Sequence, residues 1–309
     1  MRFVPLSPTR RGALKRIAGM LVATAYPPAL HSATAMSTRP IPRSGEQLPA
    51  VGVGTWQTFD VGPAAPERGE LREVVRMLSE TPRSVVDSSP MYGQAERVVG
   101  DLTSELGVRD RLFFATKVWT SGREAGIRQM EQSFRLMRVQ RMDLMQVHNL
   151  LDVDTHLKTL LDWKAANRVR YIGITHYHAG AYAELERLVK TRQFEFVQLN
   201  FSMAEREAEE RLLSVCADSG TAVIVNRPFA EGALFPRVKG RSLPAWASEF
   251  DCASWAQFFL KWILGHPAVT CVIPGTRRKA HLEDNRQAGT GRLPDAAMRR
   301  KMLEFLRAL

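Results

Sequence analysis

Residues 112–148 read LFFATKVWTSGREAGIRQMEQSFRLMRVQRMDLMQVH. The runs LFFATKV (112–118) and MDLMQVH (142–148) are short and nearly continuous in hydrophobicity, as expected of strands buried on both faces. Between them, GIRQMEQSFRLM (126–137) places apolar residues three and four apart, which is typical of an amphipathic helix. The stretch therefore predicts a strand, a helix and a second strand.

The same alternation extends along the chain. Helix-like segments at 69–80, 126–137, 155–167 and 204–220 separate the apolar runs. The runs lie at residues 50–56, 84–88, 112–118, 142–148, 170–176, 196–201, 222–228 and 270–276. Eight such units in about 270 residues match a (β/α)8 TIM barrel. A doubly wound sheet would favour a Gly-x-Gly-x-x-Gly turn, which we do not find. The segment 231–251 is expected to be a loop able to cover the site.

Composition allows a large core and argues against a transmembrane helix and against nucleic-acid binding. The chain has 309 residues, 45% of them hydrophobic, and no apolar run long enough to predict a transmembrane helix. Its formal charge is +11, but five basic residues and no acid lie in 1–35, so residues 36–309 hold 38 basic and 32 acidic residues. Such a balance, without a basic stripe carrying stacking aromatics, makes nucleic-acid binding unexpected.

The N-terminus predicts an export signal. TRRGALK (9–15) precedes the apolar stretch IAGMLVATAY, and ATA (33–35) has the small residues that a signal peptidase prefers. This resembles a twin-arginine (Tat) signal, with Ala13 where phenylalanine is usual. We therefore expect a signal peptide at 1–35, a catalytic domain at 36–309, and export by the Tat machinery to the periplasm. The alternative is a basic tail on a cytoplasmic protein.

The three cysteines predict no disulfide framework and no zinc site. Cys216, Cys252 and Cys271 form an odd set without a C-x-x-C spacing. We expect buried thiols.

Polar residues follow the predicted strands at the end where a barrel carries its active site. In strand order they are Thr55 and Trp56; Asp87, with Tyr92 in the next loop; Lys117 and Trp119; His148 and Asn149; Thr175 and His176; Gln198 and Asn200; Asn226 and Arg227; Gly275 and Thr276. Taken singly, each has a structural explanation, such as a helix cap or a core histidine. Together, an acid, a phenol, an ammonium and an imidazole on adjacent strands indicate a site.

Lys117 is the most informative of these residues. A lysine at the end of LFFAT, inside a barrel, needs a counter-charge, and Asp87 on the neighbouring strand is the candidate. An ammonium that also contacts Tyr92 would favour the phenolate and lower the phenol pKa from its usual ~10. A tyrosine so tuned is a general acid that works nearer neutral pH.

The sequence resembles the aldo-keto reductase family over residues 41–306. That family carries D-x-x-x-x-Y-G, a strand-end T-K, and V-H, which match Asp87 and Tyr92-Gly93, Thr116-Lys117, and Val147-His148. GVGTW (52–56), GIT (173–175), VQLN (197–200), IPGT (273–276) and EDN (283–285) match further landmarks. The resemblance implies hydride transfer from NADPH, or alternatively NADH, to an aldehyde or ketone, and no metal.

The resemblance also implies the roles of the four residues. Tyr92 would protonate the developing alkoxide, Lys117 and Asp87 would hold its pKa, and His148 would orient the carbonyl. Trp56 and Trp119, with His148, would wall the substrate pocket. We expect a monomer.

The implied cofactor residues depart from the family pattern in places. They are Gly54, Thr55, Asp87, Thr175, His176, Gln198, Asn226, Arg227, Pro228, Gly275, Thr276, Arg277, His281, Asp284 and Asn285. Thr175-His176 replaces the common Ser-Asn, and Asn226 stands where a nicotinamide-stacking tyrosine is frequent, so we hypothesise that Arg227 stacks instead. Gly275-Thr276 and His281 replace a Lys-Ser and an arginine that hold the 2′-phosphate, and the basic triplet 277–279 is expected to supply that charge.

Three other functions remain open from sequence alone. In the first, Lys117 is the nucleophile of a Schiff-base aldolase. In the second, the barrel binds a nicotinamide cofactor as a redox-sensing subunit with little turnover. In the third, His176 and His178 of THYH bind a metal, although barrel hydrolases place an H-x-H motif after the first strand, where this chain has GVGTW.

Overall fold

The computed structural model describes residues 35–309. The strands are β1 Thr38–Pro40, β2 Gln47–Pro49, β3 Val53–Gly54, β4 Ser84–Asp87, β5 Leu112–Val118, β6 Met142–His148, β7 Val169–Thr175, β8 Phe196–Asn200, β9 Ala222–Asn226 and β10 Val269–Val272. The helices are α1 Glu67–Glu80, α2 Ala95–Glu105, α3 Arg123–Met137, α4 Val153–Ala165, α5 Tyr182–Lys190, α6 Leu212–Asp218, α7 Leu234–Val238, α8 Trp255–Leu264, α9 Lys279–Gln287 and α10 Ala296–Ala308. The eight predicted strands are all present, each within a few residues of its expected position.

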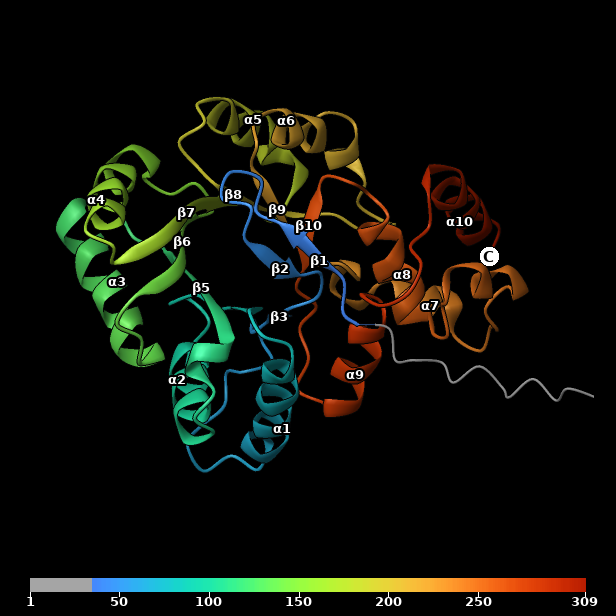
Figure 1. Ribbon diagram of the computed structural model, residues 1–309, viewed down its shortest axis with the longest axis horizontal. Coiled ribbons are helices and arrows are strands. Elements are labelled where there is room, and N and C mark those ends of the chain that lie inside the picture. The colour runs from blue at the N-terminus through green and yellow to red at the C-terminus, as the bar shows by residue number, and fades with distance from the viewer. Residues whose placement is uncertain (1–34) are drawn as a thin grey trace, which may run out of the picture. The chain divides into compact units, whose positions relative to one another are not determined.

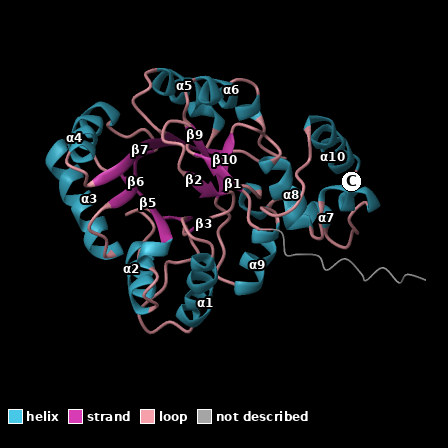
Figure 2. Ribbon diagram, viewed as in Figure 1, coloured by secondary structure: helices cyan, strands magenta, loops and turns pink. Residues whose placement is uncertain are grey.

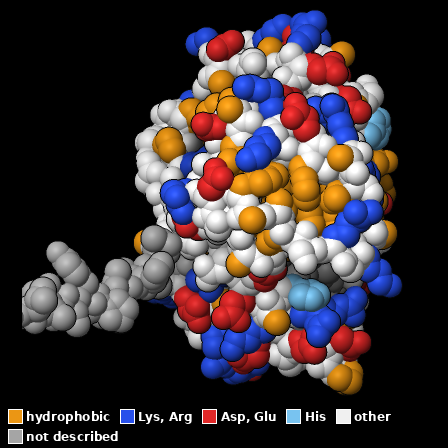
Figure 3. Space-filling model, turned by 90° about the vertical axis from the view of Figure 1, so that its right-hand side faces the viewer, with side chains coloured by type: hydrophobic (Ala, Val, Ile, Leu, Met, Phe, Trp, Pro, Cys, Tyr) orange, Lys and Arg blue, Asp and Glu red, His pale blue; other side chains and the backbone are white. Residues whose placement is uncertain are grey.

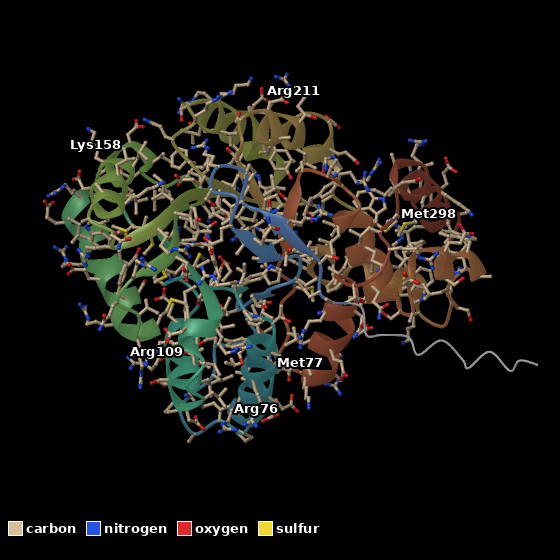
Figure 4. The ribbon with its side chains drawn as sticks, viewed as in Figure 1. Arg76, Met77, Arg109, Lys158, Arg211 and Met298 are labelled. Carbon is tan, nitrogen blue, oxygen red and sulfur yellow. The ribbon has the colours of Figure 1, made fainter. Side chains whose placement is uncertain are left out.

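The strands β3 to β10 form a parallel barrel (Figures 1 and 2). Each strand pairs with its neighbour in chain order, and parallel bridges from Val51 to Val272 and from Gly54 to Gly275 join the first strand to the last. Helices surround the strands, with Lys158 on α4 and Arg211 just before α6 at the outside of the ring (Figure 4). The TIM-barrel prediction is confirmed.

Alternation along each strand separates two apolar layers. One side faces the helices and belongs to the large core between strands and helices. The other side forms a smaller cluster inside the barrel, made of Ile41, Leu48, Val85, Phe113, Ala115, Leu144, Tyr171, Phe196, Ala222, Ile224, Cys271 and Ile273. Side chains alternate between the two faces of a strand with a period of two. On the barrel strands, the residue two positions after a member of this cluster, toward the carboxyl end, therefore also points into the barrel.

An antiparallel hairpin closes the amino end of the barrel, and the sequence did not predict it. β1 and β2 pair from Thr38–Pro49 to Pro40–Gln47, and in Figure 1 the hairpin lies across the strands. Ile41 and Leu48 are fully buried in the interior cluster. We call this hairpin the floor of the barrel, and the open end, at the carboxyl ends of the strands, its mouth.

Two predicted segments differ from the structure. The predicted helix 204–220 is α-helical only as α6, Leu212–Asp218, because within 204–211 only Ala208 is buried; that stretch turns at Ser202, whose Oγ accepts the N–H of Glu205 at 3.0 Å, and forms a 3-10 helix at Glu207–Glu209. The predicted loop 231–251 contains α7 and a 3-10 helix at Ala245–Phe250.

The 231–251 segment packs outside the barrel. Phe235 lies 5.7 Å, centroid to centroid, from Phe259 of α8, and Trp246 lies 5.6 Å from Phe305 of α10. Figure 3 shows this side of the molecule, where hydrophobic side chains gather between charged ones. The predicted loop therefore contains two short helical segments whose aromatic side chains pack against α8 and α10, and its covering of the site stays a prediction.

Three further predictions concern composition. The three cysteines are buried free thiols, as expected. None of the helices within residues 35–309 is both long and apolar enough to cross a membrane. The predicted export signal lies, apart from its last residue, outside the described residues.

Candidate active site

The inward positions of the strands change from apolar to polar toward the carboxyl end. Val85 is followed two residues later by Asp87, Ala115 by Lys117, and Leu144 by Gln146. The polar inward set comprises Asp87, Lys117, Gln146, His148, Thr175, Gln198, Asn200 and Asn226. The amino half of the barrel is thus packed with apolar side chains, and the carboxyl half holds a polar site.

The Lys117 ammonium lies at the base of this site. Lys117 is fully buried, and its Nζ donates to Asp87 Oδ2 at 2.6 Å and to the Ser88 carbonyl at 2.6 Å. Burial alone would lower the pKa of Lys117, but the Asp87 carboxylate and the Tyr92 phenol outweigh it and raise that pKa. The predicted Lys117–Asp87 ion pair is therefore confirmed.

Asp87 has two further partners, one of which the sequence analysis missed. Gln198 Nε2 donates to Asp87 Oδ1 at 2.9 Å, and Gln146 Nε2 donates to the same oxygen at 3.1 Å. Gln146 stands two residues before His148 on β6, so strand alternation would have placed it inside the barrel. These amides fix the carboxylate on the side away from Lys117.

Tyr92 lies in the loop between β4 and α2, beside the Lys117 ammonium. Lys117 Nζ is 5.0 Å from the centroid of the Tyr92 ring, and the loop is shaped by Gly93 at φ +58°, where a side chain would collide with the Asp60 carboxylate. Desolvation raises the pKa of Tyr92, and the Lys117 ammonium offsets only part of this effect. The prediction of a lowered pKa is wrong for this reason: the loss of water around the phenol outweighs one nearby cation.

His148 completes the group at the end of β6. Its ring is T-shaped against Tyr92, with centroids 5.8 Å apart, and lies 6.3 Å from the ring of Trp119. Its Nδ1 is 2.9 Å from the hydroxyl of Ser89. Burial, then the Lys117 ammonium and His176, lower the pKa of His148 to about 2, so its imidazole is neutral.

Apolar side chains stand around the mouth. Trp56, in the loop after β3, is 43% exposed; Trp119, after β5, is 40% exposed; and Met91, after β4, is 38% exposed. Large apolar side chains left in solvent at a barrel mouth are typical of a small-molecule pocket. Trp56 and Trp119 thus lie where a wall of the substrate pocket was expected.

The predicted cofactor residues of β7, β8 and β9 form one hydrogen-bonded row. Gln198 Oε1 accepts from Thr175 Oγ1 at 3.4 Å and from Asn226 Nδ2 at 3.3 Å. Asn226 Nδ2 also lies 3.5 Å from the carbonyl of His176, and Pro228 is buried just beyond. Asn226 Oδ1 is buried and accepts no hydrogen bond within residues 35–309.

Arg227 is held by charged and aromatic neighbours. Its guanidinium lies 3.3 Å from Glu205 and 3.6 Å from Glu231, and it donates to the Tyr177 carbonyl at 3.1 Å. The backbone of Arg227 has a φ of +48°, which is uncommon for a residue with a side chain. Stacking of Arg227 on a ring stays a prediction, and the loop that carries it is tied to β8 and β7.

The end of β10 and the start of α9 gather the remaining predicted residues. Gly54 and Gly275 lie where the barrel closes, and a side chain at Gly54 would come within 2.8 Å of the Ile273 carbonyl. Thr276 is buried, and its Oγ1 accepts the N–H of Arg278 at 3.1 Å. Arg277 and His281 are exposed there.

Asp284 and Asn285 follow on α9. Asp284 accepts from Ser254 Oγ at 2.8 Å and from Gln257 Nε2 at 2.7 Å, so both its oxygens are engaged at the start of α8. Asn285 is buried. Asp284 therefore joins two helices in addition to any role at the site.

The two histidines of THYH pack edge to face. The rings of His176 and His178 are 4.3 Å apart, centroid to centroid, and Tyr177 packs against both. Within residues 35–309, no group of three or more His, Cys, Asp or Glu side chains is arranged to hold a metal ion. The pair fits an aromatic contact at the rim.

A family model matches the part of the sequence that includes all eight barrel strands. The sequence model of the "Aldo/keto reductase family" matches residues 50–301. The chain is 27% identical over 258 residues to "Methylglyoxal reductase YeaE" of Escherichia coli, covering 81% of this chain and 89% of that one. It is 20% identical to "Aldo-keto reductase YhdN" of Bacillus subtilis, over 78% of this chain and 85% of that one.

Solved structures share the fold. An aldo-keto reductase of Klebsiella pneumoniae in complex with NADPH superposes with a TM-score of 0.73, at 22% identity, covering 88% of this chain and 95% of that one. The holo form of an aldo-keto reductase of Bacillus halodurans superposes with a TM-score of 0.71, at 21% identity, over 88% and 96% of the two chains.

Proposed function

This chain belongs to the aldo/keto reductase family, and from that premise we propose that it reduces an aldehyde or ketone to the alcohol with NADPH. The observation that carries the proposal is the buried Lys117–Asp87 pair, with the phenol of Tyr92 beside its ammonium and the imidazole of His148 against that phenol. The reaction needs an acid that supplies a proton as an alkoxide forms, and this group has one.

The residues at the ends of β7, β8 and β9 fit a nicotinamide carboxamide. The unpaired, buried Asn226 Oδ1 is an acceptor that an amide N–H of the carboxamide would satisfy. When bound, the reduced nicotinamide supplies the hydride. Thr175, His176 and Gln198 belong to the same hydrogen-bonded row and hold Asn226 in place.

A phosphate-binding end fits the start of α9. This helix begins beside Arg277, Arg278 and Lys279, and helix N-termini bind anions through free N–H groups. None of the three cations forms an ion pair within the described part of the chain, so their charge is available to a ligand. This favours NADPH, with its additional phosphate, over NADH.

The proton comes from Tyr92. Its raised pKa keeps the phenol protonated at neutral pH, so the acid is loaded before the substrate arrives. As the proton moves from Tyr92 Oη to the developing alkoxide, the phenolate forms beside the Lys117 ammonium, which Asp87 holds in place. The cation thus stabilises the charge that appears during the reaction rather than the resting state.

Lys117 itself is a poor nucleophile in this setting. A Schiff base requires a neutral amine, whereas Asp87 and Tyr92 raise the pKa of Lys117 despite its burial. The electrostatics therefore disfavour the aldolase alternative.

NADPH consumption against a panel of aldehydes, ketones and quinones tests the proposal. We expect turnover with at least one carbonyl class and a loss of about 10²–10⁴-fold in Tyr92→Phe. Tyr171→Phe, at the opposite end of the barrel, is the matched control and keeps its activity. Activity that survives Tyr92→Phe would refute the acid, and NADPH binding without turnover on any substrate would favour the redox-sensing alternative.

We also propose export through the Tat machinery and a monomeric state. Support for export comes from the Arg10–Arg11 pair, the apolar run after it and the ATA sequence at 33–35. Fractionation with N-terminal sequencing should find a periplasmic protein shortened near residue 35, and light scattering should give the mass of one chain. Only cytoplasmic, uncleaved protein would contradict the export proposal.

A further inference from the structure

The two serines between Asp87 and Tyr92 point in different directions. Ser88 directs its carbonyl to the Lys117 ammonium, and its hydroxyl accepts from Thr55 Oγ1 at 2.9 Å. Ser89 directs its hydroxyl to His148, with 2.9 Å between Ser89 Oγ and Nδ1. Both serines are fully buried, so neither hydroxyl is in contact with bulk solvent.

Hydrogen-bond counting assigns the proton between Ser89 and His148. Ser89 Oγ accepts the N–H of Met91 at 3.4 Å, and within residues 35–309 its hydroxyl has no acceptor other than His148 Nδ1. If Nδ1 carried the proton, the buried Ser89 O–H would have no acceptor, which costs about 1–3 kcal/mol. If Nδ1 is unprotonated, Ser89 donates to it, and both the Ser89 hydroxyl and Nδ1 have a partner.

We propose that Ser89 is a positioning residue that holds His148 in the tautomer protonated on Nε2. The inference rests on the proposed function, because it concerns the group that meets the substrate carbonyl. Nε2 makes no hydrogen bond within residues 35–309, while the ring packs against Tyr92 and Trp119 at the mouth. An Nε2–H there donates to a carbonyl oxygen, whereas the other tautomer would present a lone pair and repel it.

Neutrality of the imidazole makes the tautomer matter. Burial and the Lys117 ammonium keep His148 uncharged, so only one of its two nitrogens carries a proton. A charged imidazolium would donate from both nitrogens and need no selection. The hydroxyl of Ser89 therefore determines which of the two nitrogens of the neutral ring carries the proton.

The spectrum of the wild-type protein tests the assignment first. With the ring nitrogens of its seven histidines labelled with ¹⁵N, long-range ¹H–¹⁵N correlation distinguishes the two tautomers, and His148→Gln identifies the resonances of His148. We expect His148 to carry its proton on Nε2 at neutral pH. A wild-type spectrum with the proton on Nδ1 overturns the proposal without any need for a serine variant.

Variants then assign the effect to Ser89. Ser89→Ala should give a mixture of tautomers or the Nδ1–H form, and Ser89→Cys, which keeps the size and a weak S–H donor, should lie between it and the wild type. Ser88→Ala is the matched control and should keep the Nε2–H form. An unchanged tautomer in folded Ser89→Ala, or an equal change in Ser88→Ala, overturns the role of Ser89.

Kinetics separate this inference from the proposed function. In Ser89→Ala we expect kcat/KM for the carbonyl substrate to fall about tenfold, the worth of one hydrogen bond, with NADPH affinity unchanged. If the protein reduces no carbonyl, the proposed function fails while the tautomer can still be read. If it reduces carbonyls with the proton on Nδ1, the inference fails alone.

Discussion

Each end of the barrel combines cationic and carboxylate side chains with a tyrosine: two arginines and two carboxylates at the amino end, and the single Lys117–Asp87 pair at the carboxyl end. At the amino end, Glu46 of the floor hairpin and Asp143 accept from both Arg83 and Arg170 at 2.5–3.3 Å. The Tyr171 hydroxyl donates to Glu46 Oε2 at 2.7 Å. These ion-paired side chains keep between 11% and 30% of their surface in solvent.

The carboxyl end holds one cation in a dry place. Lys117 is fully buried, its ammonium donates to a single carboxylate and to the Ser88 carbonyl, and the ring centroid of Tyr92 lies 5.0 Å from it. The floor phenol donates to a carboxylate, whereas the mouth phenol lies beside a fully buried ammonium. The two ends use similar residue types. They differ in how far the charged side chains are exposed to solvent and in how many partners each one has, and these two properties distinguish a structural charge network from a reactive one.

The largest expected difference is the cost of removing each cation. Lys117→Met should lower the free energy of unfolding by ~3–5 kcal/mol, because it leaves Asp87 buried and unpaired, and should abolish measurable carbonyl reduction. Chemical denaturation and NADPH consumption measure the two effects.

Arg170→Met is the control at the floor. It should cost only ~1 kcal/mol, because its partners keep Arg83 and some water, and it should leave turnover in place. Equal destabilisation by the two variants would remove the distinction between the two ends.

The second difference is a pH effect at the mouth. The folded-state pKa of His148 is about 2, against an ordinary value of 6.5, so below pH 6.5 the unfolded chain binds a proton that the folded chain does not. Stability is therefore lost as the pH falls, by ~1.4 kcal/mol per pH unit for this residue. His148→Gln should show a shallower decline between pH 6 and pH 4 in denaturation curves. Parallel curves for wild type and variant would show that His148 is not buried as a neutral ring.

The smallest difference is the salt response of the floor. Glu46→Gln should cost ~1 kcal/mol at low ionic strength and less at high salt, because the Glu46 carboxylate is partly exposed to water and its ion pairs are screened. The Lys117→Met cost should hardly change with salt, since its site is dry. A Glu46→Gln cost that is independent of salt would contradict the assignment of the floor as a solvated network.

Strand periodicity explains how much the sequence could predict. The eight parallel strands lie in short, nearly continuous apolar runs, and their polar ends identify the mouth, so Asp87, Lys117 and His148 follow from the pattern. Gln146 obeys the same period of two and could have been found with them. The floor hairpin could not, because its strands have three residues each and the partners of its Glu46 are far away in the chain.

Two other features depend on distances that a sequence does not contain. The pKa of Tyr92 depends on two opposing effects, the loss of water around the phenol, which raises it, and the ammonium of Lys117, which lowers it. The loss of water is the larger effect, so the pKa is raised. Ser88 and Ser89 have different hydrogen-bond partners because of the way the loop between β4 and α2 turns. The sequence could not predict this difference, because the two residues are identical and adjacent.

The most direct test of the account follows the hydride. The reaction is run with NADPH deuterated at the transferable position, using the carbonyl that gives turnover, and the alcohol is analysed by mass spectrometry and NMR. We predict one deuterium on the carbinol carbon of the product. An unlabelled product, together with a Lys117 adduct trapped by borohydride, would contradict carbonyl reduction and favour aldolase chemistry at Lys117.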